Sequence, residues 1–151
     1  MGKLATGIGV DLTEDALDPL TALEHCSAPG HGAADLFIGR VRDINQGRQV
    51  RAVSYDLHAV LCRNVFIEIC NQAREQWGET INLWLAHRYG RLEVGEASVI
   101  AAASSRHREE SFRACRFLVE EMKHRAPIWK QEHYIDGDSE WVQGHALCGH
   151  G

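Results

Sequence analysis

Two lysines carry the most informative chemistry in this sequence. The chain contains 13 arginines but only three lysines, Lys3, Lys123 and Lys130. Two of these three lie on either side of Pro127, in the stretch MKHRAPIWKQE. Lysine, unlike arginine, can lose its proton when it is desolvated or crowded by other cations, so it can act as a nucleophile or transfer protons. This pair is therefore a candidate catalytic centre.

The proline between the two lysines determines whether they lie on one continuous helix. A residue that precedes proline is biased away from helical backbone angles, so we expect a helix that carries Lys123 to end before Pro127. The chain then turns, and the amines of Lys123 and Lys130 can converge on one pocket. The alternative is that both lysines are solubilising surface charges, and the spacing alone leaves both interpretations open.

Two pairs of cationic residues lie at the ends of other expected elements. Arg40 and Arg42 close a strand expected over residues 33–42, and His107 and Arg108 open a long helix. With the two lysines they form a basic constellation that locally outweighs the chain's net charge of −5. Taken singly, each arginine is also explained as an exposed charge, which contributes little to stability.

The start of that long helix is a candidate anion-binding site. We predict that Ser104 or Ser105 caps the helix in the stretch SSRHREE, where unpaired N–H groups and the positive end of the helix dipole favour an anion. Cations in the first turn oppose the dipole. A bound anion or the neighbouring carboxylates Glu109 and Glu110 would each compensate for them.

Composition argues against several classes of protein. A net charge of −5 disfavours a surface devoted to nucleic acid, which needs a basic face. The hydrophobic fraction of 44% and the charged fraction of 25% are ordinary for a globular domain. No apolar run approaches the ~20 residues that cross a bilayer, and no signal-peptide pattern is present. We therefore expect a cytoplasmic protein with no membrane contact.

Familiar catalytic and metal motifs are absent from the sequence, which has no P-loop, GxGxxG, GxSxG or HExxH pattern. His145, Cys148 and His150 could bind a metal, but structural zinc sites use four ordered ligands, so we expect no metal. The cysteines are odd in number and lack CxxC spacing, which indicates free, mostly buried thiols in a reducing compartment. They are Cys26, Cys62, Cys70, Cys115 and Cys148.

The periodicity of the chain predicts an α+β domain. Apolar residues at every fourth position indicate a helix over residues 59–77. Strand pairs separated by two long helices favour an α+β fold over a repeated βαβ unit. We expect a single domain over residues 1–142 and a C-terminal tail over 143–151. The other expected elements are strands over 3–10, 33–42, 49–58, 80–88 and 97–104, a helix over 13–26 and a terminal hairpin over 128–142.

Two further expectations concern the second half of the chain. The long helix after SSRHREE should bury one apolar face. That face consists of Phe112, Cys115, Leu118, Val119 and Met122. Trp129 and Trp141 lie on the two arms of the terminal hairpin, where they would either pack as a cross-strand pair or form a platform for a flat heterocycle.

Four segments of the sequence match a known pattern when they are taken in order. They are GAADLFIGRVRD, HRYGRLEVGEASV, SSRHREESFRACRFLVEEMKHRAPIWKQE and DGDSEWV. From about Gly32 to Val142 the chain resembles the large, catalytic subunit of molybdopterin synthase. The resemblance implies an α+β fold of the hammerhead type, with two long helices against antiparallel strands and a C-terminal β-hairpin.

The resemblance also implies an activity and an assembly. Members of this family transfer sulfur from the C-terminal Gly-Gly thiocarboxylate of a small ubiquitin-like carrier subunit to cyclic pyranopterin monophosphate, which forms the dithiolene of molybdopterin. The large subunit forms a homodimer, and a carrier docks at each far end to give a heterotetramer. No cofactor, metal, nucleic acid or membrane is implied.

The family's site residues transfer to specific positions of this chain. Lys123 and Lys130 would be catalytic, because they would position the thiocarboxylate, stabilise negative charge and move protons. The implied substrate-binding residues are Arg40, Val41, Arg42, His107, Arg108, Lys123, Lys130, Gln131 and Glu132. Arg42, His107 and Arg108 would hold the cyclic phosphate and the pterin as charge-assisted donors.

Some features depart from the family pattern. After Tyr55 the chain reads DLHAVLCRN, where the family tends to have a proline, and Arg40 often corresponds to a lysine. Two other functions stay open: a non-catalytic phosphoanion-binding or interaction module with the same basic pocket, and a structural dimeric scaffold. The joint presence of Arg42, His107, Lys123 and Lys130 favours the synthase, since a binding module could use arginine in place of lysine.

Overall fold

The structure is a computed structural model that describes residues 4–143. Its elements, in chain order, are β1 (Ile8–Thr13), α1 (Pro19–Cys26), β2 (Ala33–Arg40), β3 (Ile44–Asn45), β4 (Arg48–Leu57), α2 (Ala59–Trp77), β5 (Asn82–Arg88), β6 (Gly90–Glu93), β7 (Ala97–Ser105), α3 (Arg108–Arg125), β8 (Ile128–Tyr134), β9 (Gly137–Asp138) and β10 (Val142–Gln143). The expected α+β fold with two long helices and a C-terminal hairpin is confirmed.

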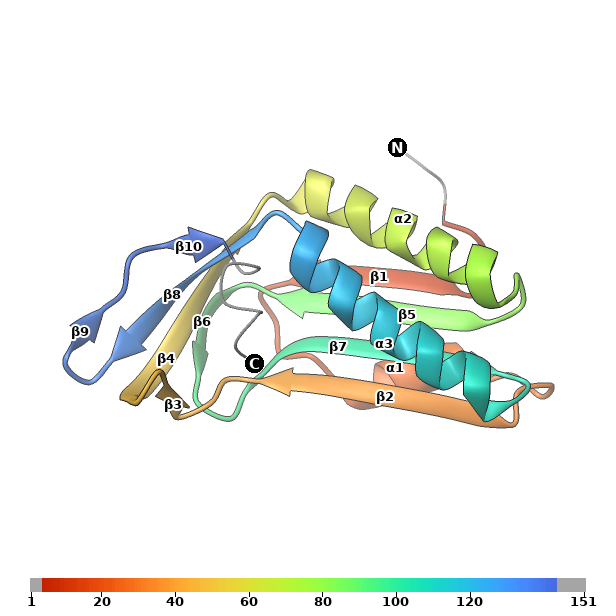
Figure 1. Cartoon of the computed structure of the whole chain (residues 1–151), viewed down its shortest axis with the longest axis horizontal. Helices are drawn as coiled ribbons and strands as arrows, with labels where there is room; N and C mark the ends of the chain where they lie inside the picture. The colour runs from red at the N-terminus through yellow and green to blue at the C-terminus, as the bar shows by residue number, and fades with distance from the viewer. Residues whose placement is uncertain (1–3, 144–151) are drawn as a thin grey trace.

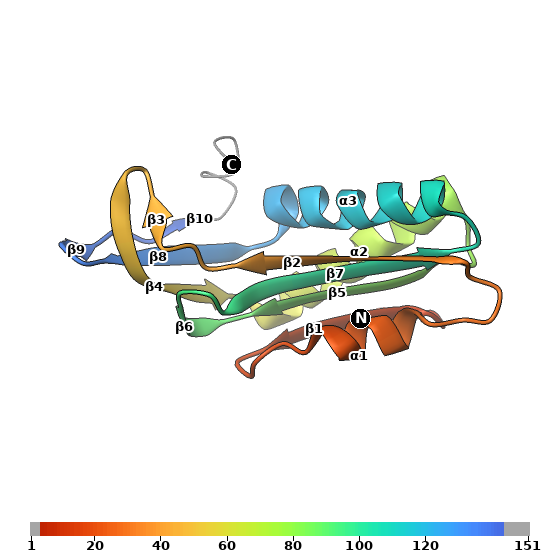
Figure 2. The same cartoon turned by 90° about the horizontal axis from the view of Figure 1, so that it is seen from below.

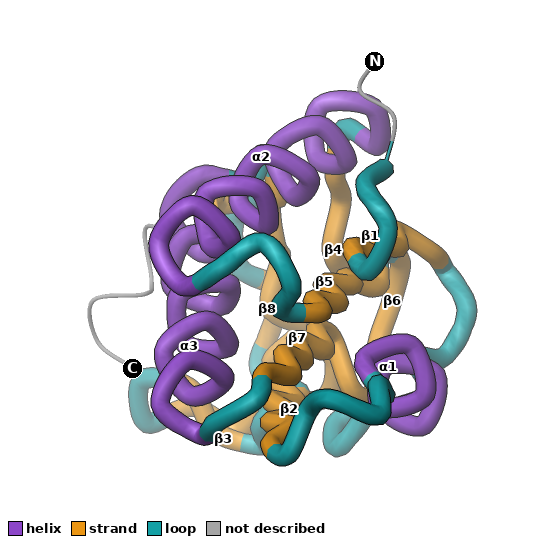
Figure 3. Tube along the Cα trace, turned by 90° about the vertical axis from the view of Figure 1, so that its right-hand side faces the viewer, coloured by secondary structure: helices purple, strands orange, loops and turns teal. Residues whose placement is uncertain are grey.

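The first sheet has four strands in the order β1-β5-β7-β2. Strands β5, β7 and β2 pair antiparallel, whereas β1 pairs parallel with β5. Helices α2 and α3 cover one face of this sheet and α1 covers the other (Figures 1, 2 and 3). Because both faces are covered, the central strand β7 is apolar and buried along nearly its whole length.

Alternation along the strands divides the buried side chains between two cores. Leu83 and Leu85 of β5 pack with Phe66 of α2 and Leu118 of α3 in the larger core. Trp84, between those two leucines, packs instead against the smaller core around α1. Successive strand residues point to opposite faces of a sheet. His87 lies two residues after Leu85, so it points to the face that α2 and α3 cover.

The second sheet has six strands and lies at the end of the first sheet where β2 and β5 finish (Figure 1). Its main path runs β10-β8-β4-β3, with β6 also paired to β4 and β9 to β8. A separate small hydrophobic core stabilises this sheet. It consists of Val41, Val50, Val53, Leu92 and Tyr134. The C-terminal end of α3 and the start of β8 lie where the two sheets meet.

The helix boundaries follow local capping. Helix α2 occupies the expected residues 59–77, and the side chain of His58 accepts a hydrogen bond from the Leu61 N–H at 3.2 Å. A histidine therefore caps this helix within the stretch DLHAVLCRN, which departs from the family pattern. Helix α1 begins later than expected, since Pro19 takes its first turn and the Asp18 carboxylate accepts from the N–H of Leu20.

Several other sequence predictions need correction. The first strand begins at Ile8 rather than at residue 3, and the segment expected to link β5 and β7 forms β6. Phe112 was expected on the buried face of α3 but is 58% exposed, whereas the other four residues of that face are buried. At this level of the helix Ser111 and Ala114 occupy the buried face, both at 0% exposure, so Phe112 points away from it.

The thiol prediction is confirmed for the cysteines that the structure describes. Cys26, Cys62, Cys70 and Cys115 are free and buried, and burial raises the pKa of each thiol to about 12. Cys148, the other candidate metal ligands and residues 144–151 of the expected tail lie outside the described residues. Across residues 4–143, no helix combines the length and apolar character needed to cross a membrane.

Candidate active site

Lys123 and Lys130 lie on two elements that meet at a sharp turn. Lys123 is in the last turn of α3, which ends at Arg125, and Lys130 is in β8, which begins at Ile128. Helix and strand are therefore separated by the Pro127 turn that the sequence predicted. Lys130 lies directly opposite Tyr55 of β4, so the two side chains share one face of the second sheet.

A buried histidine lies between the two sheets at this turn. His87, near the end of β5, is only 5% exposed. Its Nδ1 donates a hydrogen bond to the Arg88 carbonyl oxygen at 2.7 Å. The ring of Tyr55 packs edge-on against it, with 4.9 Å between ring centroids. His87 therefore connects the first sheet to the face of the second sheet that carries Lys130.

The charges of both lysines reach this histidine. Burial, together with smaller contributions from the positive charges of Lys123 and Lys130, lowers the pKa of His87 to about 4, although its hydrogen bond to the Arg88 backbone opposes this shift. Helix α3 ends and β8 begins where the two sheets meet, at the end of β5 that carries His87 (Figure 1). The structure thus brings Lys123 and Lys130 to one end of the molecule.

Glu132 adds a carboxylate to this pocket. It lies two residues after Lys130 on the same face of β8, is 4% exposed, and its Oε1 lies 3.4 Å from the Lys130 Nζ. Burial raises the pKa of the Tyr55 hydroxyl, and the charge of Glu132 adds to this effect. Tyr55 and Glu132 therefore lie with Lys130 on one face of the second sheet.

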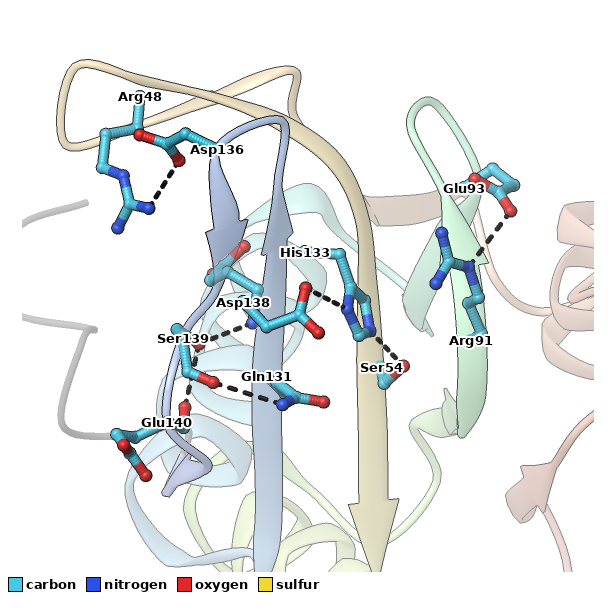
Figure 4. A network of polar contacts seen from close by, with 11 residues as sticks. Arg48, Ser54, Arg91, Glu93, Gln131, His133, Asp136, Asp138, Ser139 and Glu140 are labelled. Carbon is cyan, nitrogen blue, oxygen red and sulfur yellow. Dashed lines mark hydrogen bonds and ion pairs between the residues drawn. The ribbon is translucent and has the colours of Figure 1, made fainter.

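Gln131 points away from these groups. Residues alternate along β8, so Gln131 lies on the face opposite Lys130 and Glu132. Its Nε2 donates a hydrogen bond to the Ser139 carbonyl oxygen at 3.2 Å (Figure 4). The predicted binding role of Gln131 thus does not fit its position within one chain, where it holds the segment after β9.

The Arg40-Val41-Arg42 segment lies at the same end of the molecule as the lysines. Arg40 is the last residue of β2, in register with Ala97 at the start of β7, and is exposed. Val41 is 5% exposed and belongs to the core of the second sheet, so within one chain its side chain packs in that core. Arg42 follows on the surface. The two arginines are therefore exposed on either side of Val41, which anchors the segment in the core of the second sheet.

His107 and Arg108 lie at the other end of α3. His107 is the N-cap residue and makes no side-chain capping hydrogen bond, and both residues are exposed. From His107 to Lys123 the helix rises about 24 Å at 1.5 Å per residue. The sequence grouped all these cations in one constellation, but within one chain a continuous helix holds His107 and Arg108 far from the lysines.

The expected serine cap of α3 is wrong. Ser104 donates its hydroxyl to the Cys26 carbonyl oxygen, and Ser105 donates to the carbonyl oxygen of His107. Both hydroxyls donate hydrogen bonds to carbonyl oxygens. Neither accepts a hydrogen bond from the first N–H groups of α3. Glu109 pairs with Arg113 one turn along. The exposed start of α3 therefore keeps N–H groups and two cationic side chains facing outward.

A second polar network has the order of a Ser-His-Asp triad. Ser54 Oγ lies 2.7 Å from His133 Nε2, and His133 Nδ1 lies 3.0 Å from Asp138 Oδ1 (Figure 4). A hydrolytic triad also needs free N–H groups for an oxyanion. Ser54 instead lies inside a sheet, paired with Arg91 on one side and Gln131 on the other. This network is a structural clamp that joins β9 to β4.

Two remaining sequence predictions concern aromatic and metal sites. Trp129 lies opposite Gln143 in the β8–β10 pairing, so Trp129 and Trp141 are not cross-strand partners, and both are exposed. Within residues 4–143, no cluster of three His, Cys, Asp or Glu side chains is arranged to hold a metal ion.

Comparison with known proteins identifies the family. The sequence model of the family described as "MoaE protein" matches residues 12–125, which is most of the chain. The chain belongs to the MoaE family. The match includes Arg40, Arg42, His107, Arg108 and Lys123 and ends before Lys130.

The similar MoaE relatives are catalytic subunits of molybdopterin synthase. The chain is 45% identical to that of Synechococcus elongatus over 131 residues, which cover 86% of this chain and 79% of the relative. It is 35% identical to that of Emericella nidulans over 150 residues, which cover 99% and 76%. These alignments extend across nearly the whole chain, so the MoaE assignment does not depend on a short motif.

Solved MoaE structures share the fold. Molybdopterin synthase from Staphylococcus aureus superposes with a TM-score of 0.82 at 26% identity, covering 87% of this chain and 94% of that one. The MoaE protein from Burkholderia ambifaria superposes with a TM-score of 0.78 at 27% identity, covering 93% and 96%. The arrangement of two sheets and three helices is therefore that of MoaE proteins.

The sequence prediction missed two residues of the pocket, His87 and Tyr55. The signal for His87 was available, since it continues the alternation of Leu83 and Leu85 and therefore belongs to a buried face. Tyr55 was placed in a strand, but its contact with His87 joins two separate sheets. Only the tertiary arrangement of those sheets reveals this contact.

Proposed function

We propose that this chain is the catalytic subunit of a molybdopterin synthase. It transfers sulfur from the C-terminal thiocarboxylate of a small ubiquitin-like carrier subunit to cyclic pyranopterin monophosphate, and the product is the molybdopterin dithiolene. Membership of the MoaE family supports this activity. The observation that carries it is the placement of Lys123 and Lys130 on either side of the Pro127 turn, with the Glu132 carboxylate 3.4 Å from the Lys130 Nζ.

The two lysines take different parts in the reaction. Lys130 is paired with Glu132 at 3.4 Å and stabilises the negative charge developing on sulfur and oxygen. Lys123, on the more exposed end of α3, positions the thiocarboxylate and exchanges protons during attack and hydrolysis. Arg40 and Arg42 at the rim bind the anionic substrate.

The substrate site is completed by a second copy of the chain. One chain holds His107 and Arg108 about 24 Å from Lys123, too far for a single small substrate to contact both. In a homodimer, His107 and Arg108 of one subunit bind the cyclic phosphate and pterin beside the lysines of its partner. A carrier subunit docked at each far end makes the heterotetramer.

The reaction as proposed needs no resident cofactor or metal, because sulfur arrives on the carrier and the lysines provide the proton transfers. The assembly acts in the cytoplasm, without nucleic-acid or membrane partners. The buried, free thiols of the described cysteines are consistent with a reducing compartment.

A single substitution tests the proposed function. Lys130→Ala, supplied with a thiocarboxylated carrier and cyclic pyranopterin monophosphate, should form dithiolene product at least about a hundredfold more slowly than wild type, the range expected for loss of a group that stabilises developing charge. Lys3→Ala removes the same charge elsewhere in the sequence and is the matched control. Circular dichroism and thermal unfolding confirm that both variants are folded.

The outcomes separate the candidate functions. Product formation by wild type and Lys3→Ala but not by Lys130→Ala supports the synthase. A phosphoanion-binding module would bind the cyclic substrate, yet no variant would form product. Wild-type rates from Lys130→Ala would contradict the proposed mechanism.

A further inference from the structure

Glu96, in the turn between β6 and β7, has a carboxylate whose two oxygens both accept hydrogen bonds. Oε1 accepts from the Glu93 backbone N–H at 2.7 Å, and Oε2 accepts from the Arg88 guanidinium at 3.0 Å. The Glu96 N–H donates in return to the Glu93 carbonyl oxygen at 3.1 Å. The bond from the Glu93 N–H, followed by that from Arg88, lowers the pKa of the Glu96 carboxyl below its ordinary value. An ionised Glu96 thus closes this turn.

Arg88, the last residue of β5, connects the turn to the first sheet. Its side chain is 16% exposed, and its Nε donates a hydrogen bond to the Glu14 carbonyl oxygen at 3.0 Å. The same guanidinium holds the Glu96 carboxylate. A planar guanidinium that donates to two acceptors is held in one orientation. The Glu96 carboxylate therefore has a fixed partner at the end of β5.

The backbone of the same turn holds Val41. The Val41 N–H donates to the Glu96 carbonyl oxygen at 3.0 Å, and the Val41 carbonyl oxygen accepts from the Gly95 N–H at 2.8 Å. Gly95 has a φ of +90°, a conformation that favours glycine. The pairing of β2 with β7 ends at Arg40, so these two bonds anchor the chain one residue beyond the strand. Val41 is thus fixed by a turn that the Glu96 carboxylate stabilises.

Arg40 and Arg42 lie on either side of this anchored residue. Both are exposed, and the proposed function assigns both to the anionic substrate. A rigid backbone between two binding side chains reduces the conformational entropy that is lost when they bind a ligand. The Glu96 side chain is 39% exposed, and an exposed ion pair adds little to global stability. The main effect of the Glu96 network is therefore local, on the segment that presents the two arginines.

We propose that Glu96 is a positioning residue for substrate binding, whose carboxylate stabilises the β6–β7 turn so that the turn holds Arg40 and Arg42 in place for the anionic substrate. The role in binding rests on the proposed function. The link from the Glu96 carboxylate to the Val41 backbone is a property of the chain alone and is tested without substrate. Glu96 acts through the two arginines and does not contact the substrate.

Amide hydrogen exchange, followed by NMR on the ¹⁵N-labelled chain, tests this link. Glu96→Ala removes both acceptor oxygens, whereas Glu96→Gln keeps an oxygen for the Glu93 N–H but loses the charge that pairs with Arg88. The protection factors of the Val41 and Gly95 N–H groups should fall about tenfold in Glu96→Ala, the effect of losing a hydrogen bond to a charged group. Glu96→Gln should give a smaller decrease.

Two controls make the exchange measurement specific. The Leu83 N–H is hydrogen-bonded in the larger core, and its protection should be the same in all variants. Glu93→Gln removes a carboxylate at the start of the same turn, which pairs with Arg91 on the surface, and should leave the protection of Val41 unchanged. Equal protection of Val41 in wild type and folded Glu96→Ala would overturn the proposal. If Glu96→Ala does not fold, the same comparison with Glu96→Gln decides.

Kinetics distinguish this inference from the proposed function. In Glu96→Ala the KM for cyclic pyranopterin monophosphate should rise about tenfold, the effect of losing one charge-assisted hydrogen bond to the substrate, while kcat and the melting temperature stay close to wild type. Glu96→Gln should show a smaller rise in KM and Glu93→Gln none. A fall in melting temperature without a change in KM would mean a purely structural role and would overturn the proposal.

The two sets of measurements fail separately. If wild type forms no product while Glu96→Ala loses protection at Val41, the proposed function is refuted but the link between Glu96 and Val41 stands. If wild type and Glu96→Ala form product with the same KM, only the positioning role of Glu96 is refuted.

Discussion

His107 and Lys123 lie at opposite ends of helix α3, about 24 Å apart along its axis. The helix is continuous from Arg108 to Arg125, so no rotation of side chains brings the two residues together. Both belong to the set of residues that the family resemblance assigns to one substrate. In the proposed function a complete site uses both ends of α3, and this separation means that such a site needs two chains.

Subunit complementation tests this arrangement. Lys130→Ala and His107→Ala should each be nearly inactive as homodimers. After the two are unfolded and refolded together in equal amounts, random pairing gives mixed dimers in which one of the two sites has no substituted residue, so about a quarter of wild-type activity should return. Product formation in the sulfur-transfer assay measures the recovery.

The control for complementation uses substitutions of the two lysines, which lie on either side of the Pro127 turn. A mixture of Lys123→Ala and Lys130→Ala should stay inactive, because each site of a mixed dimer then lacks one lysine. If His107 and Lys130 of the same chain served the same site, the first mixture would recover no more activity than the control, and the shared site would be ruled out.

A charge-preserving exchange separates the roles of charge and proton transfer at Lys123. Lys123→Arg keeps a cation at the end of α3, but guanidinium does not give up its proton in proteins. We expect turnover to fall at least about tenfold while binding of the carrier is retained, because general acid–base catalysis is lost. Steady-state kinetics with titrated carrier measure both quantities.

The matched control for that exchange is Arg40→Lys, which changes one cation for the other at the rim of the site. It should leave turnover close to that of wild type, because it keeps a cation at this position. If Lys123→Arg turned over at the wild-type rate, Lys123 would provide positive charge alone.

The buried His87 should make the protein lose stability in mild acid. Its pKa is lowered from 6.5 to about 4 in the folded state, so the unfolded chain takes up a proton at a higher pH than the folded chain does. The stability that its neutral form contributes is complete above pH 6.5 and is lost as the pH falls toward 4. The full loss is about 3 kcal/mol.

Urea unfolding of wild type and His87→Phe at several values between pH 7 and pH 4 measures this contribution. The free energy of unfolding should fall less steeply with pH in His87→Phe than in wild type. His124→Ala, which removes an exposed histidine on α3, should keep the wild-type slope. Equal slopes in wild type and His87→Phe would mean that His87 is accessible to protons in the folded state.

Local features of the fold were predictable because they depend on neighbouring residues. The limits of α2 follow from apolar residues at every fourth position, and the break between α3 and β8 follows from Pro127. The start of α1 also depends on neighbouring residues, because Asp18 caps the helix and Pro19 is its first residue. In contrast, the parallel pairing of β1 with β5 joins strands more than 70 residues apart, and no local pattern encodes it.

The features of the candidate site also divide into those that the sequence determines and those that depend on tertiary structure. By itself, the sequence determined which residues carry chemistry: two lysines on either side of a proline, and cations at the ends of a strand and a helix. It also determined the turn that separates Lys123 from Lys130, because proline restricts its neighbour wherever it occurs. These properties belong to residue types and short-range backbone sterics.

Only the tertiary structure decided which of these residues meet. It placed Lys130 with Tyr55 and Glu132 on one face of the second sheet, with the ring of Tyr55 against His87 of the first sheet, and it directed Gln131 to the opposite face of β8. It also held His107 a full helix length from Lys123. Distances between elements depend on how sheets and helices pack, and that packing is set by the whole buried core rather than by any one segment.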